Sequence, residues 1–525
     1  MTKTLLPLPI GVQTFEIIRQ DNLLYVDKTS RLEELVKNCR RVFLSRPRRF
    51  GKSLTLSTLD ALFSGKAELF RGLAAEAWAA EQAKHPAPVL RLDMSMMSVS
   101  DVAQFEGSLN SALTWRAEDA GVTLSSQQPS DKFQELIRAL YRQSGPVVVL
   151  IDEYDKPILD KIGNLEAAEA MRGSLRTLYT VLKGCDEYLR FVMLTGISKF
   201  TKTGVFSAMN NLMDISMTER FGDIVGYTQD ELERDFADWI DDAAGKMRLS
   251  RQEFLMQTKD YYDGFCFDGT TRLYNPFSIL NLLANRRFSN YWYESGSPSF
   301  IVAYMKRHEI LDPEAYRHLV VKESFANSQE IERARPESFL YQAGYLTIEK
   351  WEEQSLTLDY PNREVLDSIA GMYLEHVYNV ERYDSIGSDL WRALSEGDVA
   401  RGVQLYNTAL ASIPYHDLAR RDESLYRSLF LMLLRGAGIT AHGEVPTNRG
   451  RSDVLVLFPH RVVVLEFKLA RSEGEIARLR AEGQRQIEEK GYAKPYDGEG
   501  RALTSTVIVV DAKKHTALVC FTGKR

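Results

Sequence analysis

The sequence has little cysteine, no long apolar run and no excess of charge of one sign. Four cysteines occur among 525 residues, at Cys39, Cys185, Cys266 and Cys520. They lie far apart and form neither a C-x-x-C pair nor a zinc-ligand spacing, which argues against a disulfide framework or a zinc module. This pattern is typical of reduced thiols, and we expect a cytoplasmic protein.

Membrane and secretion signals are also missing. No stretch reaches the roughly 18 uncharged apolar residues that a spanning helix needs. The start, MTKTLLPLPIGVQTF, has an apolar run that prolines break and lacks a small-residue cleavage site, so we expect no signal peptide and no membrane partner. The net charge of −6 means that any nucleic-acid surface must be a local patch.

What is present is the composition of a folded protein, 44% hydrophobic and 26% charged. Its length predicts about three domains. In the first half, apolar runs alternate with helical patterns, which indicates a parallel α/β sheet with helices on both faces. The predicted strands are 41–45, 89–95, 146–155 and 189–198, and the predicted helices are 53–63, 101–119, 131–143 and 163–184.

The loop SRPRRFGKS, residues 45–53, is like a phosphate-binding loop, G-x-x-x-x-G-K-[ST], in which Arg46 replaces the first glycine. It joins a predicted strand to a predicted helix, the arrangement that lets backbone N–H groups bind phosphate. Gly51 would admit the phosphates, Lys52 would neutralise their charge and Ser53 would bind Mg²⁺. A plain helix start with an exposed lysine is the alternative.

A second motif favours the nucleotide interpretation. The buried run VVVLI ends in Asp152 and Glu153, and ATP hydrolysis needs an acid for Mg²⁺ and a base for the attacking water. We assign these roles to Asp152 and Glu153 respectively. Thr195 or Ser198, at the end of the next strand, would help to position that water. An ordinary strand end explains either residue almost as well.

The C-terminal 110 residues or so carry another set of acids. Helices are predicted at 423–438 and 473–492, with strands at 439–445, 451–458, 461–470, 505–511 and 516–521. Period two places Glu466 and Lys468 on one face of a strand, and Asp453 lies on the preceding strand. Asp453 and Glu466 are candidate Mg²⁺ or Mn²⁺ ligands, Glu444 adds a carboxylate, and Lys468 would act on the attacking water or the scissile phosphate. A lone E-x-K triplet is also compatible with an edge-strand ion pair, and Glu488-Glu489-Lys490 is a second triplet on a helix.

The middle, 226–400, is predicted to be mostly helical. Thr228 and Glu231 form a predicted capping box. An aromatic cluster at 261–267 is expected to pack a core rather than stack on bases, and Arg220 is a candidate arginine finger whose alternative is a surface salt bridge.

Together these motifs resemble the prokaryotic AAA-ATPase-like family, whose members usually carry a C-terminal PD-(D/E)XK nuclease domain. The resemblance rests on GVQTF (11–15), YVDKT (25–29), RPRRFGKS (46–53), IDEYD (151–155) and LTGIS (194–198), and it continues over most of the chain. In that family R-P-R-R-F-G-K-S replaces the standard loop. The resemblance therefore implies a nucleotide site comprising Arg46, Arg48, Arg49, Phe50, Gly51, Lys52, Ser53 and Leu54.

The C-terminal order of helix, three strands, helix and strand also matches the PD-(D/E)XK core. There Gln486 resembles the glutamine that lies beside the family's metal site. One departure is Tyr426-Arg427, where related sequences tend to have Tyr-His. Glu423, on the same helix, is a candidate extra ligand.

These arguments predict an AAA-type P-loop ATPase domain at 1–225, a helical lid or linker at 226–400 and a nuclease-like domain at 401–525. The expected function is ATP-dependent, metal-dependent cleavage of nucleic acid, DNA more than RNA, which would suit defence or mobile-element biology. By analogy we expect homo-oligomers. Two alternatives are a nucleotide-dependent switch that binds nucleic acid or a partner without cutting, and a scaffold with a decayed ATPase.

Overall fold

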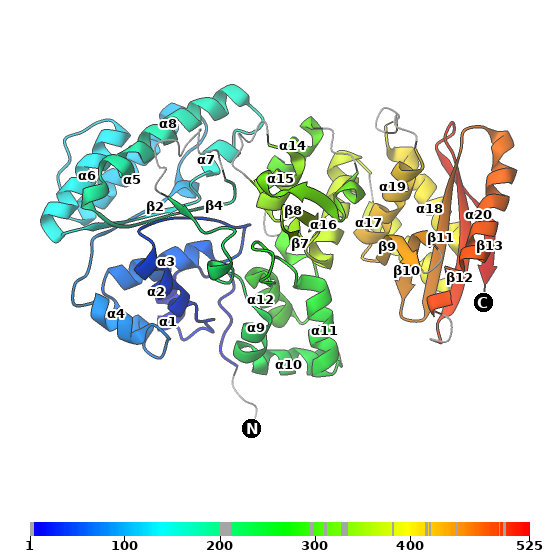
Figure 1. The fold of residues 1–525 in the computed structure, drawn as a ribbon, viewed down its shortest axis with the longest axis horizontal. Helices are drawn as coiled ribbons and strands as arrows, with labels where there is room; N and C mark the ends of the chain where they lie inside the picture. The colour runs from blue at the N-terminus through cyan, green and yellow to red at the C-terminus, as the bar shows by residue number, and fades with distance from the viewer. Residues whose placement is uncertain are drawn as a thin grey trace. The chain divides into compact units, whose positions relative to one another are not determined.

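The four strands predicted in the first half lie in one parallel sheet (Figure 1), which a short fifth strand extends. The order is β2-β3-β4-β1-β5, and every neighbouring pair is parallel. The strands β1 and β3 are buried along their whole length, as their continuous apolar runs require in a sheet that is covered on both faces. The bounds are β1 Arg41–Ser45, β2 Val89–Asp93, β3 Val147–Asp152, β4 Leu189–Gly196 and β5 Met213–Asp214.

Helices cover both faces of this sheet, as predicted. Figure 1 shows α5, α6 and α8 on one side and α1 to α4 on the other. The predicted helices are confirmed within about two residues at each end, whereas α1, α2, α4 and α7 were not predicted. The bounds are α1 Phe15–Gln20, α2 Thr29–Asn38, α3 Lys52–Phe63, α4 Glu76–Gln82, α5 Val102–Asp119, α6 Pro129–Ser144, α7 Lys156–Leu159 and α8 Leu165–Gly184.

The middle of the chain is mostly helical and includes a small antiparallel sheet, β6-β8-β7, that the sequence analysis missed. The capping box of Thr228 and Glu231 is confirmed at the start of α9. Tyr262, Phe265 and Phe267 are buried, so the aromatic cluster packs a core. The bounds are α9 Gln229–Asp235, α10 Ala237–Met247, α11 Arg251–Tyr262, α12 Pro276–Asn285, α13 Tyr291–Glu294, α14 Ser299–Arg307, β6 Leu319–Lys322, α15 Pro336–Ala343, β7 Thr347–Glu352 and β8 Ser355–Asp359.

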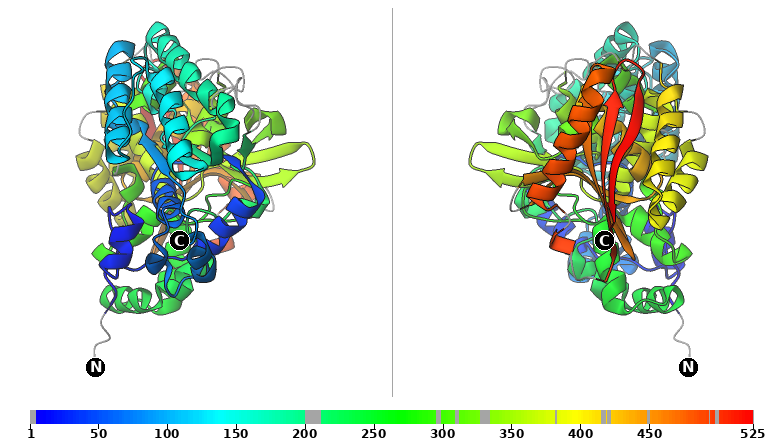
Figure 2. Two further views of the ribbon diagram at one scale, coloured as in Figure 1. Left: turned by 90° about the vertical axis from the view of Figure 1, so that its left-hand side faces the viewer. Right: turned by 90° about the vertical axis from the view of Figure 1, so that its right-hand side faces the viewer.

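The C-terminal part contains a third sheet, β13-β12-β11-β10-β9, in which only β11 and β12 pair in parallel. Helix α20 crosses between these two strands in sequence and packs on the sheet through Leu479 and Ile487 (Figure 2). The bounds are α16 Arg363–Met372, α17 Tyr383–Glu396, α18 Val399–Ser412, α19 Glu423–Gly436, β9 Thr440–Thr447, β10 Gly450–Phe458, β11 Arg461–Ala470, α20 Ile476–Lys490, β12 Ala502–Asp511 and β13 Thr516–Lys524.

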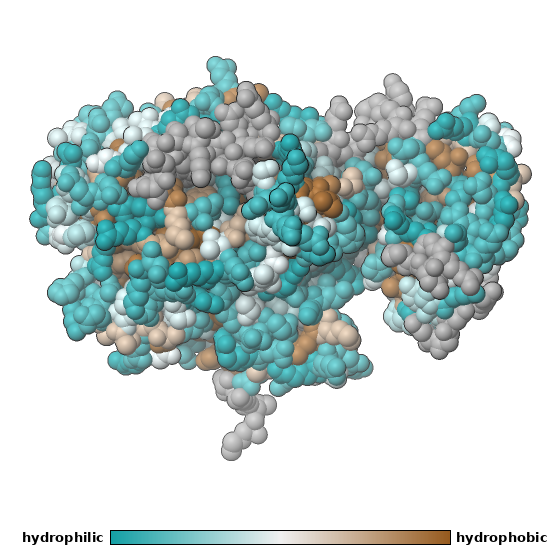
Figure 3. Space-filling model, viewed as in Figure 1, coloured by the Kyte–Doolittle hydropathy of each residue, from teal (hydrophilic) through white to brown (hydrophobic). Residues whose placement is uncertain are grey.

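The computed structural model describes residues 5–199, 212–294, 299–308, 312–326, 334–380, 383–414, 418, 422–447, 450–492, 494–496 and 500–524. The chain divides into two units, Met1–Tyr304 with His318–Glu364, and Met305–Arg317 with Val365–Arg525. The domain boundaries expected at 225 and 400 stay predictions. Among the described helices, none has the length and apolarity to cross a bilayer, and the face drawn in Figure 3 is mostly hydrophilic.

Candidate nucleotide pocket and carboxylate site

The basic loop connects the end of β1 to the start of α3. Gly51 is the residue that precedes α3, and its φ of +96° lies in the left-handed region that favours glycine. A Cβ at Gly51 would have no neighbour within 4 Å, so the backbone here is open on the pocket side. The first N–H groups of the 12-residue helix α3 are therefore available to an anion.

Lys52 folds back over this loop. Its Nζ donates hydrogen bonds to the carbonyl oxygens of Arg46 and Pro47, both at 2.8 Å, and the side chain is buried. Burial lowers the pKa of Lys52, while Asp152 and Glu153 oppose that change. The ammonium group is thus held inside the curve of the loop, beside the cavity described below.

Arg46 and Phe50 face the other way, into the protein. The Arg46 guanidinium donates to the carbonyl oxygens of Ser45, Ser216 and Gly222 and lies 4.4 Å from the Phe267 ring centroid. The Phe50 ring contacts Phe265 and Phe267, with centroids 5.0 and 5.6 Å away. The side chains of Arg46 and Phe50 therefore anchor the loop to the protein interior, and a glycine at either position would lack these contacts.

A cavity of about 720 Å³ opens over the loop, a size typical of nucleotide and cofactor sites. Arg48, Arg49, Lys52, Ser53 and Glu153 line its polar side, and Gly51 and Leu54 also border it. The Arg49 guanidinium lies over the ring of Phe277, 4.9 Å from the centroid. The apolar part of the lining comes from distant segments: Pro9, Val12, Tyr227, Pro276 and Leu280.

The acids at the end of β3 lie close to the end of β4. The Oδ1 atom of buried Asp152 accepts a hydrogen bond of 2.6 Å from the Thr195 hydroxyl. Glu153 has a left-handed φ of +47° that turns it toward the cavity. Burial, with help from Asp155 and Asp152, raises the pKa of Glu153, while Lys52 opposes the change. Because β4 lies between β1 and β3, the ends of β1 and β3 lie about two strand spacings, roughly 10 Å, apart.

Asp155 is a buried acid to which the sequence analysis gave no role of its own. Its Oδ2 atom accepts hydrogen bonds from the backbone N–H of Ile197 at 3.0 Å and from the N–H and hydroxyl of Ser198, both at 2.6 Å. Of the two candidates at this strand end, Thr195 therefore contacts Asp152 and Ser198 contacts Asp155. The only signal in the sequence was a third acid close after the strand.

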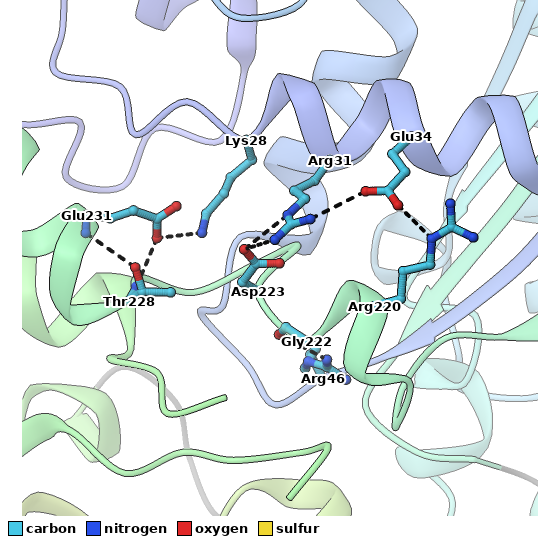
Figure 4. A network of polar contacts seen from close by, with 9 residues as sticks. All are labelled: Lys28, Arg31, Glu34, Arg46, Arg220, Gly222, Asp223, Thr228 and Glu231. Carbon is cyan, nitrogen blue, oxygen red and sulfur yellow. Dashed lines mark hydrogen bonds and ion pairs between the residues drawn. The ribbon is translucent and has the colours of Figure 1, made fainter. Parts of the chain in front are cut away.

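Arg220 belongs to a chain of ion pairs that links α2 to the segment before α9 (Figure 4). Its Nε lies 2.6 Å from Glu34, whose second oxygen pairs with Arg31, and Arg31 also binds Asp223 at 2.9 Å. Beside these residues, the Lys28 Nζ forms an ion pair of 2.6 Å with the Glu231 carboxylate. The side chain of Arg220 remains about half exposed, at 49%.

In the second unit, Asp453 and Glu466 lie on neighbouring antiparallel strands. Val454 and Leu465 are paired across β10 and β11, and Asp453 and Glu466 occupy the next position along these antiparallel strands. The Oδ2 atom of Asp453 accepts a hydrogen bond of 2.7 Å from the Phe467 N–H, and its Oδ1 atom lies 3.3 Å from the Arg427 guanidinium. The sheet thus brings together the two acids that the sequence spacing paired.

Glu466 and Lys468 form a buried ion pair of 2.7 Å between Oε1 and Nζ. Burial raises the pKa of Glu466 to about 7, and Asp453 and Glu423 add to this effect. The other oxygen of Glu466, Oε2, is buried and has no hydrogen-bond partner among the residues that the structure describes. A buried carboxylate oxygen without a partner, beside a second acid, fits a hard divalent cation well.

The other candidates lie around this pair in different ways. Glu423, on α19, accepts a hydrogen bond of 3.1 Å from the Leu469 N–H, and burial raises its pKa. Gln486 donates to the Tyr492 hydroxyl at 3.1 Å. Glu444 is exposed, and its two oxygens pair with Arg427 at 2.7 Å and with Arg451. Glu444 is therefore already satisfied by two guanidinium groups.

Comparisons with known proteins identify two domains in this chain. Residues 9–206 match a family model described as predicted AAA-ATPase, and residues 421–519 match the PD-(D/E)XK nuclease superfamily. The chain is similar to an "Uncharacterized protein in vnfD 5'region" of Azotobacter chroococcum mcd 1, with 36% identity over 513 residues that cover 94% of this chain and 95% of the relative.

Similarity to solved structures is weak. The Aeropyrum pernix ORC1 protein, solved in complex with DNA, shares 10% identity at a TM-score of 0.26, covering 81% of this chain and 87% of its own. The Aeropyrum pernix ORC2 protein, solved with ADPNP and ADP, shares 13% identity at a TM-score of 0.27, covering 84% and 90%. Scores this low carry no argument about this chain.

Proposed function

The chain belongs to the family of predicted AAA-ATPases that carry a C-terminal PD-(D/E)XK nuclease superfamily domain, and from this premise we propose that it is an ATP-dependent nuclease. ATP would bind in the cavity over residues 46–53, and phosphodiester bonds, of DNA more than of RNA, would be cut beside Asp453 and Glu466. Binding or hydrolysis of ATP would control the cleavage.

For the ATPase, the supporting observation is the cavity itself, because it joins Lys52, Ser53 and Glu153 to an apolar end that suits a purine base. The N–H groups at the start of α3 and the ammonium of Lys52 bind phosphate oxygens. Glu153 takes a proton from the attacking water, and its raised pKa brings it closer to the working pH. Thr195 orients Asp152. Ser53 and Asp152 would hold a Mg²⁺ ion, which supplies charge neutralisation for the phosphates.

For the nuclease, the supporting observation is the unpartnered Oε2 of Glu466, on the same face as Lys468 and opposite Asp453. Asp453 and Glu466 would hold a Mg²⁺ or Mn²⁺ ion, which supplies Lewis-acid activation and charge for the scissile phosphate. Lys468, fixed by its ion pair with Glu466, keeps a positive charge next to the reacting phosphate, because the neighbouring carboxylates outweigh burial and raise its pKa.

The test is cleavage of labelled single- and double-stranded DNA and RNA by the purified protein, with Mg²⁺ or Mn²⁺ and with or without ATP. Lys468→Ala should abolish cutting, since it removes the buried cation. Lys490→Ala is the matched control, because Lys490 belongs to an E-x-K triplet on α20 and should leave cutting unchanged. Lys52→Ala should remove ATP hydrolysis and the ATP dependence of cutting. Metal-independent cutting, or cutting that survives Lys468→Ala, would contradict the proposal.

One observation favours a second candidate, a nucleotide-dependent switch that binds nucleic acid or a partner without cutting it. The Arg427 guanidinium pairs with Asp453 where relatives of this family tend to have histidine. Intact ATP hydrolysis together with nucleic-acid binding and no cleavage of any substrate would support this function.

Assembly is a further part of the proposal. AAA-type sites are often completed by a neighbouring copy. Arg220 is half exposed and would reach such a neighbour only by releasing Glu34. Sedimentation of the protein with and without ATP, beside Arg220→Ala, tests this part.

A further inference from the structure

Arg427 lies within the carboxylate site of the second unit, beside Asp453 and Glu444, and the proposed nuclease mechanism gives it no role. It occupies the face of α19 one turn after Glu423, so both side chains reach the ends of β10 and β11. Its Nη1 lies 3.3 Å from the Asp453 Oδ1, and its Nη2 lies 2.7 Å from the Glu444 Oε1. The guanidinium therefore bridges two acids that the sequence marked as metal ligands.

The Arg427–Asp453 half of this bridge is largely sheltered from water. The side chains of Arg427 and Asp453 are only 15% and 16% exposed, whereas Glu444 is 45% exposed. Arginine keeps its charge at any ordinary pH and is weakly hydrated, so it is well suited to a permanent place in such a site. A pairing that is removed from water is also screened less by salt than a surface ion pair.

The charges of the site can be compared with the charge of one divalent ion. Glu423, Glu444, Asp453 and Glu466 supply four carboxylates, and Arg427, Arg451 and Lys468 supply three cations. One negative charge remains, which a single divalent ion more than neutralises. A second ion beside it would leave three positive charges without a counter-charge, and burial of uncompensated charge is costly.

We propose, on the basis of the nuclease function above, that the Arg427 guanidinium fills the second cation position of this site. The site then binds one divalent ion, between Asp453 and Glu466, and Glu444 serves as a partner of Arg427 rather than as a metal ligand. Glu466 Oε2, the buried oxygen without a partner, marks the side on which that one ion binds.

The test counts Mn²⁺ ions bound to the full chain without nucleotide, by the electron paramagnetic resonance signal of free Mn²⁺. Asp453→Asn should bind one ion fewer than the wild type, because it removes the ligand of the single ion. Arg427→Gln should bind one ion more, since the vacated position regains its negative charge. Arg451→Gln is the matched control: it also removes a guanidinium from Glu444 but leaves Asp453 paired, and it should bind the wild-type number.

Glu444→Gln gives an independent answer that does not depend on the folding of the Arg427 variant, because its side chain is exposed. It should keep the wild-type Mn²⁺ affinity within about twofold. A loss of roughly tenfold or more, as expected when a carboxylate ligand is removed, would overturn the proposal. Two ions lost in Asp453→Asn, or an unchanged count in Arg427→Gln with wild-type circular dichroism in EDTA, would also overturn it.

The same measurements distinguish a failure of the single-ion proposal from a failure of the proposed nuclease function. If the ion counts are as expected but no nucleic acid is cut, the single-ion site stands and the nuclease proposal falls. If Asp453→Asn binds as many ions as the wild type, the carboxylate site is not a metal site, and both proposals fall.

Discussion

Replacement of Arg46 tests whether this residue of the basic loop stabilises the fold or binds the nucleotide. The family resemblance implied that Arg46 binds the nucleotide, but its guanidinium contacts three carbonyl oxygens and the Phe267 ring inside the protein. We expect Arg46→Met to lower stability while it leaves the nucleotide affinity of the folded protein almost unchanged. Arg49→Met, an exposed change on the cavity side, should do the reverse.

The magnitude follows from the contacts of Arg46. Methionine has a similar length and can fill the space beside Phe267, but it donates no hydrogen bond, and each carbonyl left without a donor costs about 1–3 kcal/mol. Part of this loss is offset, because burial lowers the pKa of Arg46 and so its charge is held at a cost. We expect a net loss of about 2–4 kcal/mol, which corresponds to a melting temperature lower by roughly 5–10 °C.

The assay is thermal unfolding without nucleotide, followed by titration of a fluorescent ATP analogue at a temperature at which all variants are folded. Arg49→Met should melt within about 2 °C of the wild type and bind the analogue about tenfold more weakly, the value of one phosphate contact. The reasoning is refuted if Arg46→Met melts like the wild type and loses as much affinity as Arg49→Met.

Three further predictions concern the same unit. Gly196→Ala should destabilise the protein by about 2 kcal/mol or more, because a Cβ there would lie 2.6 Å from both Asp155 Oδ1 and the Tyr154 ring; Gly173→Ala, on an open face of α8, is the control in thermal melts. Burial raises the pKa of Asp155 in the folded protein. The free energy of unfolding of the wild type, relative to Asp155→Asn, should therefore fall as the pH rises from about 4 through the folded-state pKa. Thermal unfolding of both proteins across that pH range measures the direction of this change. Thr228→Ala should cost about 1 kcal/mol, since it breaks the capping box at α9, and Thr228→Ser should restore most of the loss in denaturant titrations.

Local patterns in the sequence predicted much of the fold. Strand β1 has the predicted bounds, and the register of β10 and β11 follows from the alternation around Asp453 and Glu466. These features depend on neighbours in sequence and on side-chain periodicity, so they can be read directly from the chain.

The missed features depend on distant partners. Nothing near Arg46 indicates that Ser216 and Gly222 will accept its hydrogen bonds, because both lie some 170 residues away. Likewise, the choice of Thr195 for Asp152 and of Ser198 for Asp155 depends on how β3 and β4 align. The roles assigned to the candidate residues stay predictions until the variants are measured.

The lining of the nucleotide cavity has a consequence for synthesis of the chain. Its walls come from residues as early as Pro9 and as late as Ala303, with Tyr227 and Pro276 between them. A ribosome adds residues in order at about 5–20 per second, so the loop at 46–53 emerges roughly 10–50 seconds before the last part of its cavity. During that interval the growing chain has the phosphate loop but no complete pocket. A chain that ended before Pro276 would therefore contain the motif but would lack part of the cavity lining.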